Sequence, residues 1–243
     1  MTQRILMRRM PGHRPLLLDL FCCAGGAATG YHRAGFDVVG VDIVDRPNYP
    51  FRFVRADALE YLAALIASGE IRRFAAVHTS PPCQAGCALT IGTNKSRGWG
   101  RDHVQLIPGL RTLLDATGLL YVIEQPNGKA PVRRDVWLCG EMFGLGVLRH
   151  RNFELGRWTV PQPAHPKHRG YVRGYRHGVY RDGPYVAPYG AGGGKATVSE
   201  MQQAMGITWT DVREELTEAI PPAFSEHIGR ALLTAIRPVE VAA

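Results

Sequence analysis

A cysteine placed directly after two prolines is the sharpest chemical signal in this sequence. The segment SPPCQ, residues 80–84, follows the short apolar run 74–78. Because proline fixes its own φ, the backbone before Cys83 is stiff, and the thiol projects from a strand end. A cysteine there acts as a nucleophile if nearby cations or a helix N-terminus lower its pKa. We predict a catalytic Cys83; a buried, inert cysteine is the alternative.

A glycine-rich turn lies near the start of the chain. The segment DLFCCAGG, residues 19–26, ends an apolar run and opens a helical stretch towards Ala34. Its glycines let a ligand approach the backbone, and a helix N-terminus attracts negative groups. Asp42 ends the next apolar run, where an acid holds ribose hydroxyls in nucleotide-binding folds. These residues alone do not separate NAD from S-adenosylmethionine, or either from a plain strand-to-helix turn.

The elements that must position these residues alternate between strands and helices. Apolar runs predict strands at 16–21, 38–43, 74–78 and 119–123, with a weaker one ending at Asp57. Helical spacing follows at 59–66, and a further helix is predicted to begin at Asp102 and to be bent or shortened by Pro108. This alternation predicts an α/β fold with a doubly wound, mostly parallel sheet and ligands at the carboxyl ends of its strands.

The periodic pattern is interrupted once. Residues 157–195 are rich in Gly, Pro, Tyr, His and Arg and show little periodicity, which indicates a small irregular insertion between 1–156 and 196–243. Regular patterning returns at Ser199, which forms a predicted capping box with Gln202. A last helix carries an apolar stripe of Phe224, Ile228, Leu232 and Ile236. The two flanking parts are therefore expected to form one sheet domain.

Composition limits the class of protein. Of 243 residues, 45% are apolar and 21% charged, which is typical of a soluble globular chain. A net charge of +8 favours a polyanionic partner, nucleic acid first. The apolar runs are too short to cross a bilayer and the N-terminus lacks a signal-peptide pattern, so we expect a cytoplasmic protein. Five cysteines argue against a disulfide framework, and Cys83 and Cys87 lack a partner pair at zinc spacing, so no metal is expected.

Five ordered motifs resemble those of the DNA cytosine-5 methyltransferases. DLFCCAGG with AGFDVVGVDI resembles the cofactor loop and second strand, SPPCQ the catalytic-cysteine motif and IEQP the catalytic-glutamate motif. Residues 149–151 resemble the paired-arginine motif, and LTEAIPPAFSEHIGRAL the C-terminal motif. The resemblance spans residues 16 to about 233. It implies a Rossmann-like methyltransferase fold, S-adenosylmethionine as cofactor, and a compact, bacteriophage-like enzyme acting in a bacterial host cell, as in restriction-modification.

The resemblance also implies a set of catalytic residues. Cys83 adds to C6 of a cytosine flipped out of the duplex, and the activated ring then takes the methyl group at C5. Glu124 contacts the N3 and N4 edge of the base, and Arg151, with Arg149, holds the base or its phosphate and favours the thiolate. Gln84 lines the site around the displaced base. A solvated strand-end acid and a plain surface arginine pair are the competing interpretations of Glu124 and of the arginines.

The same resemblance implies how the cofactor is held. Phe21 packs on S-adenosylmethionine, Gly25 and Gly26 admit its methionine end, and Asp42 takes the ribose hydroxyls. Asp57 accepts from the adenine amino group, with an ordinary helix N-cap as its alternative. The full implied set is Phe21, Cys23, Gly25, Gly26, Asp42, Ile43, Asp57, Ala58, Pro82 and Glu218.

Three residue choices depart from the family pattern. Cys23 stands where the family usually has glycine, and Gln125-Pro126 replaces the usual Asn-Val after the catalytic glutamate. Glu218 replaces an asparagine expected near the cofactor. A carboxylate there favours the cationic amine of the cofactor or alters cofactor preference; we expect ordinary S-adenosylmethionine in a slightly altered pocket.

The segment 157–195 is much smaller than the family's usual target-recognition domain. Its basic residues are interleaved with tyrosines, so phosphate, guanine-edge and stacking contacts are all available. The predicted DNA contacts are Arg157, Lys167, Arg169, Arg173, Arg176 and Arg181. We expect a monomer that recognises a short or degenerate site in double-stranded DNA. An RNA (tRNA) cytosine methyltransferase and a non-catalytic protein that binds DNA or S-adenosylmethionine are the alternatives; the intact Cys83, Glu124 and Arg151 argue against the second.

Overall fold

The computed structural model describes residues 13–82, 106–176, 178–188 and 196–236. The predicted nucleophile Cys83, its neighbour Gln84 and the predicted helix cap Asp102 lie outside these residues. The structure does describe Pro81 and Pro82, the two residues that directly precede Cys83.

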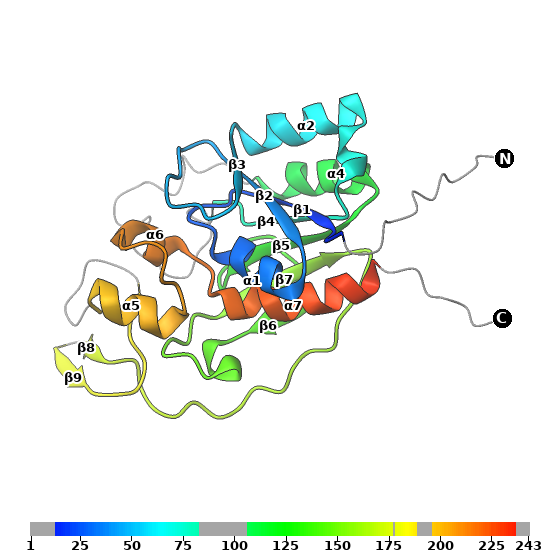
Figure 1. Ribbon diagram of the computed structural model, residues 1–243. Coiled ribbons are helices and arrows are strands. Elements are labelled where there is room, and N and C mark those ends of the chain that lie inside the picture. The colour runs from blue at the N-terminus through cyan, green and yellow to red at the C-terminus, as the bar shows by residue number, and fades with distance from the viewer. Residues whose placement is uncertain (1–12, 83–105, 177, 189–195, 237–243) are drawn as a thin grey trace.

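Seven strands of the described residues form one sheet in the order β3-β2-β1-β4-β5-β7-β6 (Figure 1). The strands from β3 to β5 in this order pair in parallel, whereas β7 lies antiparallel to both of its neighbours, β5 and β6. The chain winds outward from β1 to β3 and restarts at β4 on the other side of β1, which confirms the predicted doubly wound, mostly parallel sheet. The strands are β1 Leu16–Leu20, β2 Asp37–Asp42, β3 Arg52–Arg55, β4 Ala76–Thr79, β5 Leu120–Pro126, β6 Val136–Leu138 and β7 Arg151–Gly156.

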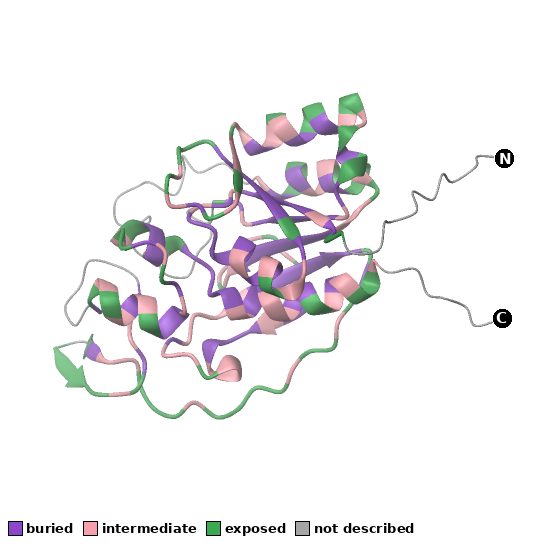
Figure 2. Ribbon diagram, in the orientation of Figure 1, coloured by how far each residue is buried: buried purple, intermediate pink, exposed green. Residues whose placement is uncertain are grey.

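Helices cover both faces of the sheet, and the central strands β1, β2, β4 and β5 are almost entirely buried (Figure 2). One apolar cluster joins the sheet to α1 and α7 through Tyr31 and Phe224, and another joins it to α2 and α4 through Leu62 and Leu114. A third cluster, smaller, lies around α5 and α6. The helices are α1 Gly26–Ala34, α2 Ala58–Ser68, η1 Glu70–Arg73, α4 Ile107–Thr117, η3 Gly140–Phe143, α5 Val198–Met205, α6 Arg213–Glu218 and α7 Pro222–Ala235.

Two glycines let the first and last helices approach closely. A Cβ on Gly26 would lie 2.3 Å from the carbonyl oxygen of Ile220, and one on Gly30 would lie 2.1 Å from that of Pro222. No side chain fits at such distances without a backbone shift. The C-terminal motif is therefore held directly against the helix that follows the glycine-rich turn.

Several local predictions need correction. The capping box of α5 uses Thr197 and Glu200 rather than Ser199 and Gln202, because the Glu200 carboxylate accepts from the Thr197 amide at 2.7 Å. Of the two effects predicted for Pro108, the structure has it at the start of a helix and not at a bend: it lies in the first turn of α4, where its missing N–H has no intrahelical partner to lose. The insertion, expected to be irregular, contains a short hairpin of β8 Gly174–Arg176 and β9 Val179–Arg181. None of the helices that the structure describes combines the length and apolarity needed to cross a membrane.

Candidate active site

The predicted catalytic and cofactor residues lie along one edge of the sheet. The register places Leu20 beside both Val41 and Thr79, and Thr79 beside Ile123. The carboxyl ends of β1, β2, β4 and β5 therefore lie next to one another. The residues that follow or end these strands, among them Phe21, Asp42, Pro82 and Glu124, are brought to this edge, where open α/β sheets bind their ligands.

Glu124 and Arg151 form an ion pair at the end of β5. The antiparallel pairing of β5 with β7 brings the two strands' ends together, and Arg151 Nε lies 2.7 Å from Glu124 Oε1. Only 5% of the Glu124 side chain and 14% of the Arg151 side chain are exposed. A pair this buried has its geometry set by mutual attraction in a poorly solvated site. Two residues predicted from separate motifs are thus direct partners.

Gln125 connects this pair to the segment that leads to Cys83. Its Nε2 donates to the carbonyl oxygen of Pro81 at 2.6 Å, and Gln125 itself is buried. Pro81 is buried and Pro82 is exposed. The sequence indicated Gln125 only as a departure from the family pattern, yet this hydrogen bond holds Pro81, two residues before the predicted nucleophile, against the end of β5.

Arg149 serves the C-terminal motif. Its Nε donates to the carbonyl oxygen of Ala219 at 2.8 Å and its Nη2 to that of Thr217 at 2.6 Å, while Nη1 lies 3.2 Å from the carbonyl oxygen of Pro188. Its backbone has φ of 40°, in the left-handed region. These contacts hold the turn that carries Glu218, so Arg149 is a positioning residue here, and its predicted contact with the base stays a prediction.

The Asp42 carboxylate has several interaction partners within the protein itself. Its carboxylate accepts from the amides of Cys23 and Val44, each at 3.0 Å, and Arg46 Nε lies 3.3 Å from Oδ2. Asp42 is 7% exposed. Arg46 was not predicted; its i,i+4 spacing from Asp42 was the available signal. A ribose bound by Asp42 would have to share the carboxylate with this arginine.

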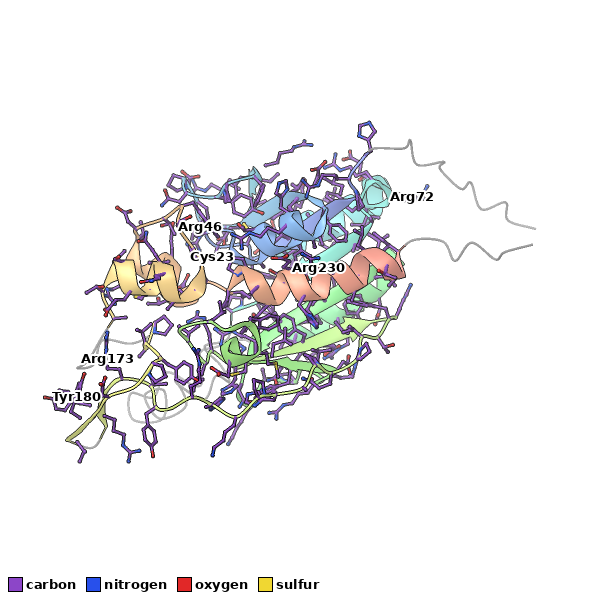
Figure 3. All side chains as sticks on the ribbon, turned by 60° about the horizontal axis from the view of Figure 1, so that its bottom comes forward. Cys23, Arg46, Arg72, Arg173, Tyr180 and Arg230 are labelled. Carbon is purple, nitrogen blue, oxygen red and sulfur yellow. The ribbon has the colours of Figure 1, made fainter. Side chains whose placement is uncertain are left out.

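Two of the departures from the family pattern contact each other. The Cys23 thiol donates to Glu218 Oε2 across 3.5 Å. Burial raises the pKa of Cys23 to about 12, and the Glu218 carboxylate adds to that rise against the opposing effect of Arg46. The thiol is therefore neutral at pH 7 and serves as a hydrogen-bond donor. Figure 3 shows Cys23 and Arg46 side by side at this end of the sheet.

The remaining cofactor residues surround the same strand ends. Ile43 is 63% exposed directly after Asp42, which leaves an apolar side chain available at the edge. Gly25 caps α1 with φ of 83°, a conformation that glycine adopts without strain. Asp57 is the N-cap of α2, and its Oδ1 accepts from the amides of Leu59 and Glu60. The alternative given for Asp57 is thus present, and Ala58 behind it is buried.

Buried polar side chains next to the predicted catalytic segment form a chain of hydrogen bonds, and sequence reasoning missed it. His78 Nδ1 hydrogen-bonds to the Tyr31 hydroxyl and Nε2 to the Ser80 hydroxyl, each at 2.9 Å. Complete burial lowers the pKa of His78 to about 3, so the ring is neutral at pH 7. The chain ties the residue before Pro81 to α1. A histidine inside an apolar strand was the signal.

Asp19 is a second buried polar group at this edge. It lies between Gly40 and His78 in the register and is 1% exposed. Burial raises the pKa of Asp19 well above its usual value, the Asp42 carboxylate raises it further, and the Tyr49 hydroxyl opposes the rise. Burial therefore favours the neutral form of Asp19.

The predicted DNA-contacting arginines divide into tied and exposed groups. Arg157 donates to the carbonyl oxygen of Asp115 at 2.8 Å, Arg169 pairs with Glu141 at 3.0 Å, and Arg173 pairs with Glu200 at 2.5 Å. These three hold the insertion to the rest of the chain.

The exposed group lies on and beside the β8–β9 hairpin. The Arg181 guanidinium stacks 4.7 Å from the centre of the Tyr171 ring, and Tyr175 packs edge-on against Tyr180. Tyr171, Tyr175 and Tyr180 are each at least half exposed. Lys167 is exposed as well, and only the backbone of Arg176 is described. Figure 3 shows Tyr180 and Arg173 at the end of the molecule opposite Arg72.

Comparison with known proteins supports the fold. No protein-family model matches the sequence, and no curated protein matches it. A provisionally assigned DNA modification methyltransferase encoded within a prophage (E. coli) aligns with a TM-score of 0.59 and 13% identity over 90% of this chain and 99% of that chain. The Entamoeba histolytica methyltransferase EhMeth aligns with a TM-score of 0.50 and 11% identity over 93% and 99%. The chain therefore has the fold of these two methyltransferases.

Proposed function

We propose that this chain is an S-adenosylmethionine-dependent DNA cytosine-5 methyltransferase. The observation that carries the proposal is the hydrogen bond from Gln125 to Pro81 beside the Glu124–Arg151 pair. It anchors the segment that leads to Cys83 next to an acid and a cation at the ligand-binding edge of the sheet. A thiol, an acid and an arginine in this arrangement suit nucleophilic addition to a flipped base.

The reaction needs a nucleophile because cytosine C5 is a weak one. The Cys83 thiolate forms a bond to C6, and the electron pair of the C5–C6 double bond moves towards C5 and N3. C5 would then bond to the methyl group as the bond between that methyl group and the cofactor's positively charged sulfur breaks, and S-adenosylhomocysteine would leave with the electron pair of the broken bond. Loss of the C5 proton to a base and elimination of the Cys83 thiolate restore the aromatic ring.

Glu124 and Arg151 stabilise the charge that this addition creates. A carboxyl group against the N3 and N4 edge accepts from the N4 amino group and, when protonated, donates to N3 as negative charge develops there. Arg151 holds Glu124 in place through their 2.7 Å contact and supplies a positive charge that favours a thiolate nearby. Both side chains are mostly buried, so these interactions act in a site with little water.

The residues at the strand ends fit the cofactor. S-adenosylmethionine, when bound, supplies a methyl group on a positively charged sulfur. The Glu218 carboxylate offers a partner for its ammonium group, Asp42 for the ribose hydroxyls and the exposed Ile43 for the adenine face. The Glu218–Cys23 contact fixes that carboxylate at the C-terminal motif. Replacing Glu218 with Asn should weaken S-adenosylmethionine binding in calorimetry, and equal affinity would remove Glu218 from the site.

The hairpin supplies the contact with DNA. Exposed tyrosines can stack on bases or sugars, and Arg181 and Lys167 can reach phosphates. The +8 net charge of the chain acts in the same direction. One structural neighbour is encoded within a prophage, which supports an origin in a phage or mobile element and a role in protection or modification of DNA.

Nucleoside mass spectrometry of cells without native cytosine methylation tests the proposal. The native chain should produce 5-methylcytosine in DNA, Cys83→Ala should produce none, and Cys87→Ala, a cysteine in the same segment, should behave as the native chain. 5-Methylcytosine found only in RNA would make the chain an RNA methyltransferase. Binding of S-adenosylmethionine without modification of either pool would favour the non-catalytic alternative.

A further inference from the structure

A cysteine and three histidines gather where β6 ends and β7 begins. The ligand atoms of Cys139, His150, His165 and His168 all lie within 4.8 Å of one another. Cys139 directly follows β6, His150 directly precedes β7, and the two remaining histidines come from the insertion. No role in the proposed methyl transfer falls to any of them.

The spacing of these atoms suits a tetrahedral metal ion. Cys139 Sγ lies 3.5 Å from His168 Nε2, and His168 Nε2 lies 3.2 Å from His165 Nε2. Zinc bonds of about 2.0–2.1 Å to nitrogen and about 2.3 Å to sulfur place neighbouring ligand atoms about 3.3–3.5 Å apart in a tetrahedron. A thiolate with three imidazoles suits zinc far better than the oxygen-preferring magnesium or calcium.

The surroundings of the cluster fix the orientation of one histidine and bury the cysteine. The Trp137 ring stacks on His150 with centroids 4.9 Å apart and planes 9° apart, which fixes that imidazole's orientation. Cys139 is fully buried, which shields a metal–thiolate bond from water.

We propose that these four residues bind one zinc ion that fastens the insertion to the sheet. Four protein ligands leave no open position, which is the pattern of a structural rather than a catalytic site. Residues 157–173 contain no helix or strand in the described structure, so their position depends on side-chain ties. His150 lies between Arg149 and Arg151, so the ion also stiffens the backbone that carries the Glu124 partner.

Metal analysis of the untagged, full-length protein tests this site without any reference to methyl transfer. Elemental mass spectrometry should find about one zinc per chain in the native protein. Cys139→Ser and His168→Ala should each lose it, whereas His227→Ala, at a half-buried histidine on α7 outside the cluster, should retain it. Cobalt added to the metal-free native protein should give tetrahedral d–d bands and a thiolate charge-transfer band, and the second should vanish in Cys139→Ser.

Chelation gives a readout that remains available if a variant folds poorly. Removing the metal from the native protein should speed proteolytic cleavage within 157–188, and added zinc should restore resistance. A native protein that neither carries zinc nor takes up cobalt would overturn the proposal, as would equal zinc in the native chain and in both ligand variants. Either result is independent of whether the chain methylates DNA.

Discussion

The sheet edge and the insertion place their polar residues by different means. At the edge, Glu124 and Asp42 end strands whose register is fixed by backbone ladders, and the strands are buried on both faces. In the insertion, Arg169, Arg173 and the histidine cluster are held by individual side-chain contacts. Residues at the edge are therefore positioned by the sheet as a whole, whereas each polar residue of the insertion depends on a few contacts of its own.

The difference predicts where a substitution acts. Changes at the edge should reduce chemistry or whole-chain stability, because many buried contacts depend on one another there. Changes in the insertion should act on DNA binding and on the local resistance to proteolysis, because its side chains contribute little to the two main apolar clusters.

Glu124→Gln should give the largest effect on the proposed reaction. It removes the acid at the base edge and the charge that orients Arg151, so the methylation kcat should fall by about 10²–10³-fold, equivalent to about 3–4 kcal/mol. Single-turnover methylation of a cytosine-containing duplex measures it. The matched control is Glu154→Gln, a buried β7 acid paired with Arg111 at 2.7 Å but away from the edge. The control should lose stability and keep the kcat of its folded fraction; equal losses of kcat would contradict the assignment of Glu124.

His78→Gln should change how stability depends on pH. The folded pKa of His78, about 3, lies below its ordinary 6.5, so only the unfolded chain takes up this proton between those values. Its contribution to stability is complete above pH 6.5 and is lost as the pH falls towards 3. As the pH falls, the free energy of unfolding should decrease less steeply in the variant than in the native chain. The two slopes should differ by up to about 1.4 kcal/mol per pH unit.

Denaturant unfolding at pH 6.5, 5.5 and 4.5 measures that slope, with pH 6.5 chosen at the ordinary value. Tyr31→Phe is the control, because it removes the hydroxyl partner and keeps the imidazole. It should cost about 1 kcal/mol at every pH and keep the native slope. An unchanged slope in His78→Gln would show that the buried ring does not carry this proton linkage.

Gly26→Ala should destabilise the chain by about 1–3 kcal/mol, because its Cβ would meet the Ile220 carbonyl oxygen and push the C-terminal motif from α1. Gly109→Ala is the matched control: Gly109 is also helical, and a Cβ there meets nothing within 4 Å. That control should be neutral or stabilising by about 0.5–1 kcal/mol. Thermal unfolding of both variants measures the difference, and similar melting temperatures would exclude the close contact.

Sequence reasoning predicted the elements whose apolar residues follow a regular pattern. The strands at β1, β2, β4 and β5 follow from apolar runs, and the doubly wound sheet follows from their alternation with helices. Glu124 and Arg151 were both named from motifs, although only the antiparallel β7 shows that they pair. No regular apolar pattern predicted β7, because its sequence RNFELG mixes charged and apolar residues.

Contacts between distant, single side chains escaped prediction. The Cys23–Glu218 contact joins residues 195 positions apart, and the Tyr31–His78–Ser80 chain joins a helix to a strand end. The cysteine–histidine cluster was missed, and no metal was expected, because spacing rules look for paired ligands close in sequence. Its ligands come from the end of β6, the start of β7 and the insertion. Such contacts depend on the assembled fold, which a linear pattern does not encode.

The smallest predicted effect separates the two groups of arginines within the insertion. Arg181→Ala removes an exposed guanidinium that stacks on Tyr171, so the slope of log affinity for DNA against log salt should fall by about 0.9. Its melting temperature should not change. Arg169→Ala instead breaks the Glu141 pair, so it should leave the salt slope at its native value and speed proteolysis of the insertion. Fluorescence anisotropy over a salt series measures both slopes. If Arg169→Ala lowered the slope as much as Arg181→Ala, the tied arginines would have to leave their carboxylate partners to meet DNA, and the insertion would rearrange on binding rather than dock as it stands.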